Sequence, residues 1–141
     1  MKRGIVLFIG AAIVVGAVAL GFTVVKGQRL PQPVNPSAYQ SIFPDQLSAL
    51  LQRKDFLLVN VHIPYAGQVE GTDFFVPYTD VETKVPATLP DRQAKIVLYC
   101  QTGRMSAIAA EALVRMGYTN VVNLDGGMVA WERAGYPVHQ R

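Results

Sequence analysis

The sequence predicts an α/β fold in which a central parallel sheet is flanked by helices and preceded by one N-terminal transmembrane helix. Short apolar, β-branched runs alternate with amphipathic segments through the C-terminal hundred residues, a pattern typical of parallel sheets covered on both faces. One long apolar run near the N-terminus predicts the membrane helix. The 141 residues give room for one such domain and an appendage.

The first element is an apolar run over residues 4–25 (GIVLFIGAAIVVGAVALGFTVV), which follows a short basic N-terminus at residues 1–3. As a helix it would extend about 33 Å, enough to cross a hydrocarbon core of about 30 Å. A core helix of a soluble protein does not need to be apolar on every face over such a length, so the run favours a membrane helix over a core helix. A cleaved secretory signal is the alternative, because residues 17–19 (AVA) resemble a cleavage site. The run continues well beyond that site, so we expect an uncleaved anchor.

Charges flank this span almost symmetrically, with Lys2 and Arg3 before it and Lys26 and Arg29 after it. The N-terminal amine favours a cytoplasmic N-terminus, which would leave the body of the protein outside the cytoplasm. Small residues four positions apart could also form a weak homodimer within the membrane. These pairs are Ala12 with Gly16 and Ala17 with Gly21.

A proline-rich linker is expected over residues 26–39, and the globular domain over residues 40–141. The formal charge of +3 belongs to the membrane-flanking residues, because ten Lys and Arg remain against ten Asp and Glu from residue 27 onward. The domain has no basic stripe with interleaved aromatic residues. Nucleic acid is therefore excluded as a partner.

Within the domain, helices and strands are expected to alternate. A helix is predicted where leucines share one face, in residues 45–52, and a second where apolar side chains recur at helical spacing, in residues 105–116 before Gly117. A last short helix is predicted over residues 128–135. Short apolar runs predict strands over residues 56–61, 73–78, 95–100 and 120–124.

Cys100, the only cysteine, ends the third of these strands, at the sheet edge where ligands of α/β proteins bind. It could be an inert apolar filler, and a single cysteine excludes an intramolecular disulfide. The residues between it and the next helix favour a nucleophile instead, because their N–H groups would converge in front of the sulfur. The helix N-terminus and Arg104 would stabilise a thiolate and attract anions. Gly103 permits backbone conformations that a side chain would block.

Two stretches of the domain resemble the rhodanese-like sulfurtransferase family. The first is VLYCQTGRMSAIAAEALVRMGYTNVVNLDGGMVAWERAGYPV, which has the cysteine loop, helix and terminal motif of that family in order. The second, FLLVNVHIPYAGQVEGTDFFVPY, is similar to the first strand, loop and next strand of the family. Together the resemblance covers roughly residues 41–138.

The resemblance implies a three-layer fold and a mechanism. Cys100 would take the outer sulfur of a small anionic donor, such as thiosulfate or a persulfide, and pass it as a persulfide to cyanide or a thiol. The backbone amides of the loop would hold the terminal sulfur, and no metal or cofactor is expected. The loop consists of Gln101, Thr102, Gly103, Arg104 and Met105.

The chain departs from the family pattern at two places. Asn60-Val61-His62 stands where Asp-Val-Arg is common, and Gln101 and Met105 stand where many active loops carry arginine. Arg104 is then the only charge in the loop, so weaker capture of thiosulfate is expected. The alternative function is a non-catalytic module that binds a partner or senses sulfur or redox state.

The remaining polar and aromatic candidates have mainly structural interpretations. Ser106 stands where a related phosphatase would need an arginine to wrap phosphate, which disfavours phosphatase chemistry. His62 follows the first strand and is a possible rim residue of the pocket, the alternative being a capping or surface role. Trp131 is expected to pack its helix on the sheet, and the turn at residues 125–127 to be structural. His139 is expected to be solvated.

Overall fold

A computed structural model describes residues 39–140 of the chain. The predicted membrane helix at residues 4–25 and nearly all of the linker at residues 26–39 lie outside the described residues. Between residues 39 and 140, no helix is both long enough and apolar enough to cross a membrane. The anchor, its orientation and its pairing therefore stay predictions.

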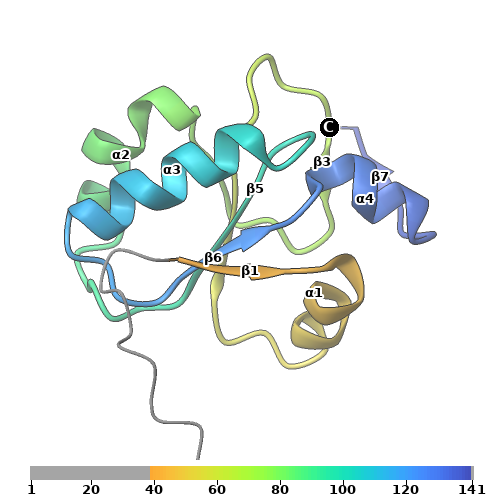
Figure 1. The fold of residues 1–141 in the computed structure, drawn as a ribbon, viewed down its shortest axis with the longest axis horizontal. Coiled ribbons are helices and arrows are strands. Elements are labelled where there is room, and N and C mark those ends of the chain that lie inside the picture. The colour runs from red at the N-terminus through yellow and green to blue at the C-terminus, as the bar shows by residue number, and fades with distance from the viewer. Residues whose placement is uncertain (1–38, 141) are drawn as a thin grey trace, which may run out of the picture. The chain divides into compact units, whose positions relative to one another are not determined.

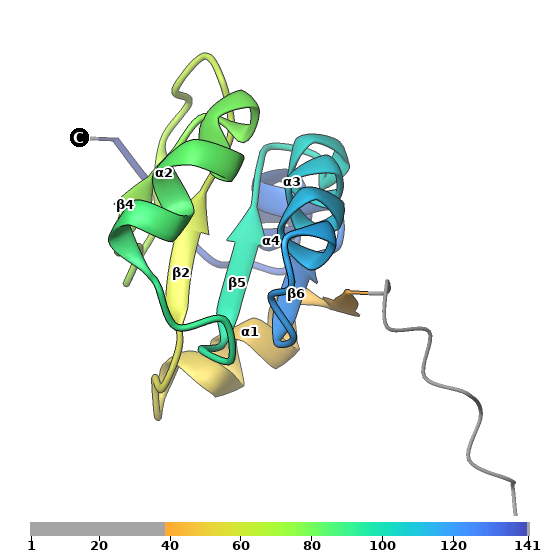
Figure 2. The same ribbon diagram turned by 90° about the vertical axis from the view of Figure 1, so that its left-hand side faces the viewer.

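The core of the domain is a five-stranded sheet in which all neighbouring strands are parallel, as the sequence predicts. The strand order is β1-β6-β5-β2-β4, so β5 lies in the middle (Figure 2). Every residue of β5 and β6 is buried, as expected for strands covered on both faces. The strands are β1 (Gln40–Ile42), β2 (Leu57–Asn60), β4 (Phe74–Phe75), β5 (Ile96–Tyr99) and β6 (Val121–Leu124).

Helices cover the two faces of this sheet and complete three layers (Figure 1). Ile96 and Leu98 of β5 pack in one core cluster with α3, while Val97 and Tyr99 pack in the other cluster with residues of α1 and α4. A separate antiparallel pair joins two short strands. The elements are α1 (Pro44–Leu51), β3 (Gln68–Val69), the 3-10 turn η1 (Tyr78–Asp80), α2 (Val81–Thr88), α3 (Arg104–Arg115), α4 (Gly127–Arg133) and β7 (Val138–His139).

Two features of the helices differ from the sequence prediction. Helix α2 is an additional element; it contains Pro86 and buries only Val81 and Val85, so its apolar pattern is weak. Helix α3 is present as predicted, but Ile108 of its predicted buried face is 46% exposed, whereas Ser106 is fully buried. Ser106 shares the buried face with Ala109, Ala110 and Leu113, and its hydroxyl has hydrogen-bonding partners inside the domain.

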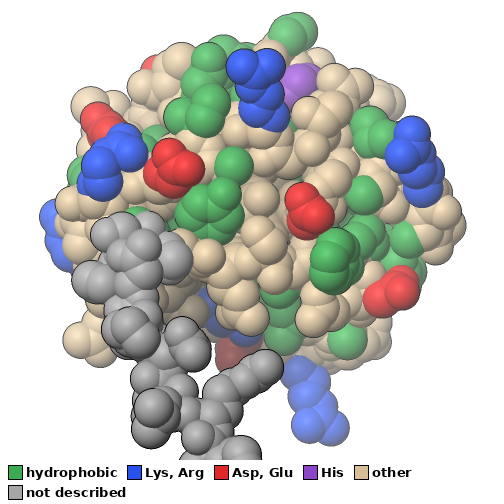
Figure 3. All heavy atoms as spheres, viewed as in Figure 1, with side chains coloured by type: hydrophobic (Ala, Val, Ile, Leu, Met, Phe, Trp, Pro, Cys, Tyr) green, Lys and Arg blue, Asp and Glu red, His purple; other side chains and the backbone are tan. Residues whose placement is uncertain are grey.

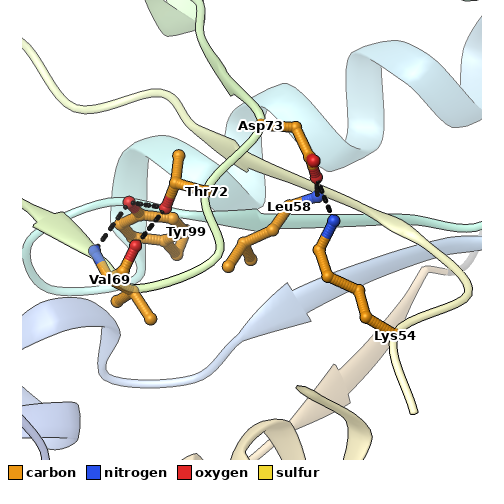
Figure 4. Close-up of polar contacts among 6 residues, drawn as sticks. All are labelled: Lys54, Leu58, Val69, Thr72, Asp73 and Tyr99. Atoms are coloured by element: carbon orange, nitrogen blue, oxygen red, sulfur yellow. Dashed lines mark hydrogen bonds and ion pairs between the residues drawn. The ribbon is translucent and has the colours of Figure 1, made fainter. Parts of the chain in front are cut away.

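Polar contacts fix the segment between β3 and β4 against the sheet (Figure 4). The Tyr99 hydroxyl accepts a hydrogen bond from the Val69 N–H at 3.0 Å and lies 2.7 Å from Thr72 Oγ1. Burial raises the pKa of Tyr99. The Asp73 carboxylate accepts from the Leu58 N–H at 2.8 Å and pairs with Lys54. The segment from Val69 to Asp73 is thus hydrogen-bonded to β2 through Leu58 and to β5 through Tyr99.

Candidate active site

Cys100 directly follows β5 at the carboxyl edge of the central strand, and only 1% of it is exposed. The neighbouring strand β2 continues one residue past its end, because the Val61 N–H donates to the Tyr99 carbonyl oxygen at 2.9 Å. The carboxyl ends of β2, β5 and β6 therefore meet around the thiol. This is the edge at which α/β sheets bind ligands.

Two donors converge on the sulfur of Cys100. The Gly103 N–H donates to Sγ at 3.0 Å, and Ser106 Oγ lies 3.5 Å from Sγ. Ser106 Oγ also lies 3.1 Å from the Gly103 carbonyl oxygen, so its hydroxyl can turn to either acceptor. Sequence reasoning used Ser106 only as a marker of loop length. Ser106 is the third residue of α3, so its spacing of six residues from Cys100 places it in the first turn of that helix.

Gly103 has a left-handed backbone, with φ of +89°, and this conformation directs its N–H back toward the sulfur. An L-residue rarely adopts such a φ. A Cβ at this position would also come within 3.0 Å of the Gly126 nitrogen. The cysteine loop and the turn before α4 are therefore packed backbone against backbone.

The N-terminus of α4 holds the carbonyl side of the cysteine loop. The Met128 N–H donates to the Cys100 carbonyl oxygen at 2.8 Å, and the Val129 N–H donates to that of Gln101 at 2.9 Å. Gly127, with φ of +57°, allows this contact, because a Cβ there would lie 2.3 Å from the Cys100 carbonyl oxygen. The turn at residues 125–127 is structural, as predicted, and it supports the site directly.

The other loop residues face outward. Gln101, Thr102 and Arg104 are exposed, whereas Met105 is half-buried against the α3 side of the core. Arg104 is the first residue of α3 and forms no ion pair with a described residue. Its free positive charge and the helix N-terminus both favour an anion in front of the loop. On the face drawn in Figure 3, basic and acidic side chains are scattered.

Asn60 and His62 lie next to this edge, at the end of β2. The Asn60 side chain is fully buried; its Oδ1 accepts from the His62 N–H at 3.0 Å, and its Nδ2 donates to the Gly67 carbonyl oxygen at 2.9 Å. Asn60 thus closes the loop that contains His62. Only 8% of His62 is exposed, so the surface role considered for it is wrong. Burial lowers the pKa of His62.

The remaining predicted residues lie away from the thiol. Trp131 is 4% exposed, stacks on Tyr136 at a ring distance of 4.4 Å and donates to the Pro137 carbonyl oxygen, which confirms its packing role. His139 is exposed on β7, as expected. A surface cavity of about 430 Å³ is lined by Trp131, Tyr136 and residues of α1, but Cys100 is not among its walls.

No cluster of three or more metal-ligating side chains occurs between residues 39 and 140. Around Cys100 the described residues bring together a thiol, two hydrogen-bond donors and the unpaired charge of Arg104. This set can hold negative charge on sulfur, whether as a thiolate or on a sulfur atom attached to it.

The sequence of the domain is similar to the sequences of known proteins. Residues 43–134 match the family model of the rhodanese-like domain. A sulfurtransferase of Allochromatium vinosum is 32% identical over 91 residues, which cover 63% of this chain and 83% of that protein. The thiosulfate sulfurtransferase PspE of Escherichia coli K12 is 33% identical over 70 residues, which cover 48% of this chain and 67% of PspE.

Solved structures share the fold as well. A thiosulfate sulfurtransferase of Pseudomonas aeruginosa superposes with a TM-score of 0.62 at 27% identity, over 72% of this chain and 20% of that one. The chain also spans about half the length, 54%, of a Synechocystis protein that is 32% identical over 100 residues.

Proposed function

The chain belongs to the rhodanese-like domain family, and on that premise we propose that it is a sulfurtransferase that carries sulfur on Cys100. The observation that carries the proposal is the convergence of the Gly103 N–H and the Ser106 hydroxyl on the Cys100 sulfur. A buried thiol used only as filler has no need of two donors and an adjacent free cation.

In the first half of the reaction, the Cys100 thiolate attacks the outer sulfur of the donor. With thiosulfate, the sulfur–sulfur bond of the donor breaks, sulfite leaves with the electron pair, and Cys100 becomes a persulfide. The negative charge then resides on the new terminal sulfur. The Gly103 N–H and the Ser106 hydroxyl, at the N-terminus of α3, are suited to this charge. A fixed N–H dipole stabilises an anion without having to reorganise.

In the second half, an acceptor attacks the terminal sulfur and Cys100 leaves as the thiolate. Arg104 is the only charged residue in the loop, since Gln101 and Met105 occupy the positions where the family often has arginine. This composition favours donors with less charge than thiosulfate, such as persulfides, and thiols as acceptors. We propose persulfide-to-thiol transfer as the main activity.

We further propose that residues 4–25 anchor the domain to a membrane with the domain outside the cytoplasm. The support is the length and apolar character of this run. Fusing alkaline phosphatase to the C-terminus tests the orientation, because that enzyme is active only outside the cytoplasm. An active fluorescent-protein fusion with an inactive phosphatase fusion would contradict it.

The test of the enzymatic proposal is to incubate the purified full-length chain with thiosulfate or an organic persulfide and to measure its intact mass. We expect one added sulfur atom on the wild type and none on Cys100→Ser, with the fold of both checked by circular dichroism. A folded wild type that gains no sulfur from any donor would leave the non-catalytic binding or sensing module as the function.

A further inference from the structure

Phe43 is an exposed aromatic residue at the same edge of the sheet as the thiol. It directly follows β1, and 62% of it is exposed, more than any other large apolar side chain between residues 39 and 140. Because β1, β6 and β5 are parallel neighbours, their carboxyl ends lie at one edge, and Figure 1 shows β1 and β6 ending on the same side. Phe43 and Cys100 therefore both lie at the edge where the reaction is proposed to occur.

The alternation of side chains places Phe43 and Cys100 on the same face of the sheet. The residues before them, Ile42 and Tyr99, both pack in the core cluster on the α1 and α4 side. Phe43 keeps an extended backbone, with φ of −96° and ψ of 165°, and successive side chains of an extended chain point to opposite faces. Phe43 is thus directed to the α3 side, where Cys100 packs in the other cluster.

The end of β6 joins Phe43 to the cysteine loop. The Asp125 N–H donates to the Ile42 carbonyl oxygen at 2.8 Å, which sets Asp125 beside Phe43. On the other side, a Cβ on Gly103 would lie only 3.0 Å from the Gly126 nitrogen. The turn after β6 therefore contacts the cysteine loop on one side and the end of β1 on the other.

The start of α1 follows the usual rules for a helix N-terminus except at Phe43. Pro44 is the first helical residue, and the Gln46 side chain accepts from the Phe43 N–H at 2.8 Å. Ile42 and Leu47 pack in one core cluster, as the residues that flank a helix start often do. Ser, Thr, Asp or Asn is preferred at the cap, because a phenyl ring accepts no hydrogen bond from an N–H. A single departure from an otherwise consistent local pattern is expected where a residue serves function.

Unpaired charges accompany Phe43 at this surface. Asp125 and Arg104 are both exposed, and neither forms an ion pair with a described residue. An apolar contact with polar and charged residues around it is the composition of a protein–protein interface. The backbones of Phe43 and Cys100 are two strand spacings apart, about 10 Å. A small thiol that reacts at Cys100 would not reach Phe43, whereas a polypeptide would.

We propose that Phe43 binds an apolar side chain of a protein whose cysteine accepts sulfur from Cys100. The inference rests on the proposed sulfurtransferase function and leaves its chemical steps unchanged. The acceptor is a cysteine in an extended segment, with an apolar residue about three positions away, because an extended chain rises about 3.3 Å per residue. Phe43 is then a specificity residue for the acceptor and takes no part in loading.

The experiment uses full-length protein that has first been loaded with sulfur on Cys100, so a failure of the proposed function would already appear as a wild type that does not load. Two short glycine-rich peptides carry one central cysteine and differ only at the third position on either side of it, which is leucine in one and serine in the other. Single-turnover transfer to each peptide and to dithiothreitol is measured for the wild type and Phe43→Ser. The matched control is Phe74→Ser, which removes another exposed phenylalanine, on the edge strand β4 at the opposite side of the sheet.

We expect the wild type to use the leucine peptide about tenfold faster than the serine peptide at low peptide concentration, as partial burial of a leucine against an aromatic ring provides. Phe43→Ser should lose this preference, keep the wild-type rate with dithiothreitol and load sulfur normally, whereas Phe74→Ser should keep the preference. Equal use of both peptides by the wild type, or an unchanged preference in Phe43→Ser, would overturn the proposal.

Denaturant unfolding separates this role from a role in folding. Serine at position 43 supplies the missing cap of α1, so Phe43→Ser should unfold at the same or a higher denaturant concentration than the wild type. A lower midpoint would show that Phe43 serves the fold and would overturn the proposal. If the wild type uses both peptides equally and only Phe43→Ser loses self-association in gel filtration, Phe43 is a contact between copies of the chain and the proposal is likewise overturned.

Discussion

Ser106 Oγ lies 3.5 Å from the Sγ of Cys100, although Cys100 directly follows β5 and Ser106 lies in α3. The same hydroxyl lies 3.1 Å from the Gly103 carbonyl oxygen. It can therefore donate to the carbonyl while the sulfur is protonated and turn to the sulfur when negative charge develops there. This choice of acceptors makes Ser106 a charge-responsive donor at the site.

Replacing Ser106 by alanine should slow the loading of sulfur on Cys100 by about ten- to a hundredfold, since a hydrogen bond to a charged group contributes about 1.5–3 kcal/mol. The rate of mass gain with a persulfide donor measures this effect. Thr102→Ala is the matched control, because Thr102 is a hydroxyl residue of the same loop but is exposed. Equal loading rates in the wild type and Ser106→Ala would contradict the role of the hydroxyl.

Replacing Gly127 by alanine should destabilise the domain and disable loading. The new Cβ would lie 2.3 Å from the Cys100 carbonyl oxygen, so the loop must move. Gly135→Ala is the control, since Gly135 has φ of +90° with no atom within 4 Å of the added Cβ. Gly135→Ala should lower the free energy of unfolding by about 1–2 kcal/mol, and Gly127→Ala by at least about 1 kcal/mol more. Denaturant unfolding compares the two, and similar losses would refute the steric argument.

Replacing Arg104 by glutamine should raise the KM for thiosulfate by about three- to tenfold, because an exposed charge near an anion contributes about 1 kcal/mol. The KM for an uncharged organic trisulfide should change little, and added salt should reduce the difference between Arg104→Gln and wild type. Arg115→Gln, at the other end of α3, is the control. An unchanged KM for thiosulfate would show that Arg104 does not contact the donor.

Replacing Tyr99 by phenylalanine should lower the free energy of unfolding at neutral pH by about 1–3 kcal/mol, because the Val69 N–H loses its buried acceptor. Denaturant unfolding measures the loss. Thr83→Val is a control that removes a hydroxyl from an exposed position, and a similar loss in both variants would contradict a special role of Tyr99.

The same variant should change how stability depends on alkaline pH. Burial raises the pKa of Tyr99 in the folded domain, whereas an unfolded tyrosine ionises near pH 10. The stabilisation is therefore complete below about pH 10 and is lost as the pH rises toward the folded pKa. The free energy of unfolding of the wild type should fall with pH above about 10 more steeply than that of Tyr99→Phe, and parallel curves would contradict this.

The sheet and the position of Cys100 could be predicted because they depend on local patterns. The run before Cys100 is apolar throughout, which indicates a strand buried on both faces, and Gly103 marks the turn into a helix. The helix face was predicted less well. Amphipathic patterns assign polar residues to solvent, so they leave out a buried serine such as Ser106 and include Ile108, which is exposed.

Other features depend on contacts that no local pattern records. The β3–β7 pair has two residues in each strand, too few for a visible alternation. The hydrogen bonds from Met128 and Val129 to the cysteine loop join segments far apart in the chain. Paired glycines at 126 and 127 indicated a tight turn but not its partner. The burial of His62 likewise depends on the Asn60 side chain, whose amide hydrogen-bonds both the His62 N–H and the Gly67 carbonyl oxygen.

The hydrogen bonds from α4 to the cysteine loop also bear on the synthesis of the protein. Cys100 leaves the ribosome before Met128 and Val129, whose amides hold the carbonyl groups of Cys100 and Gln101. Until those amides arrive, the nascent chain has a thiol without the loop geometry that surrounds it in the finished domain. A chain truncated after β6 would keep its cysteine and lose the support of its loop. The loop around Cys100 is thus completed by α4, a segment that is synthesised after it.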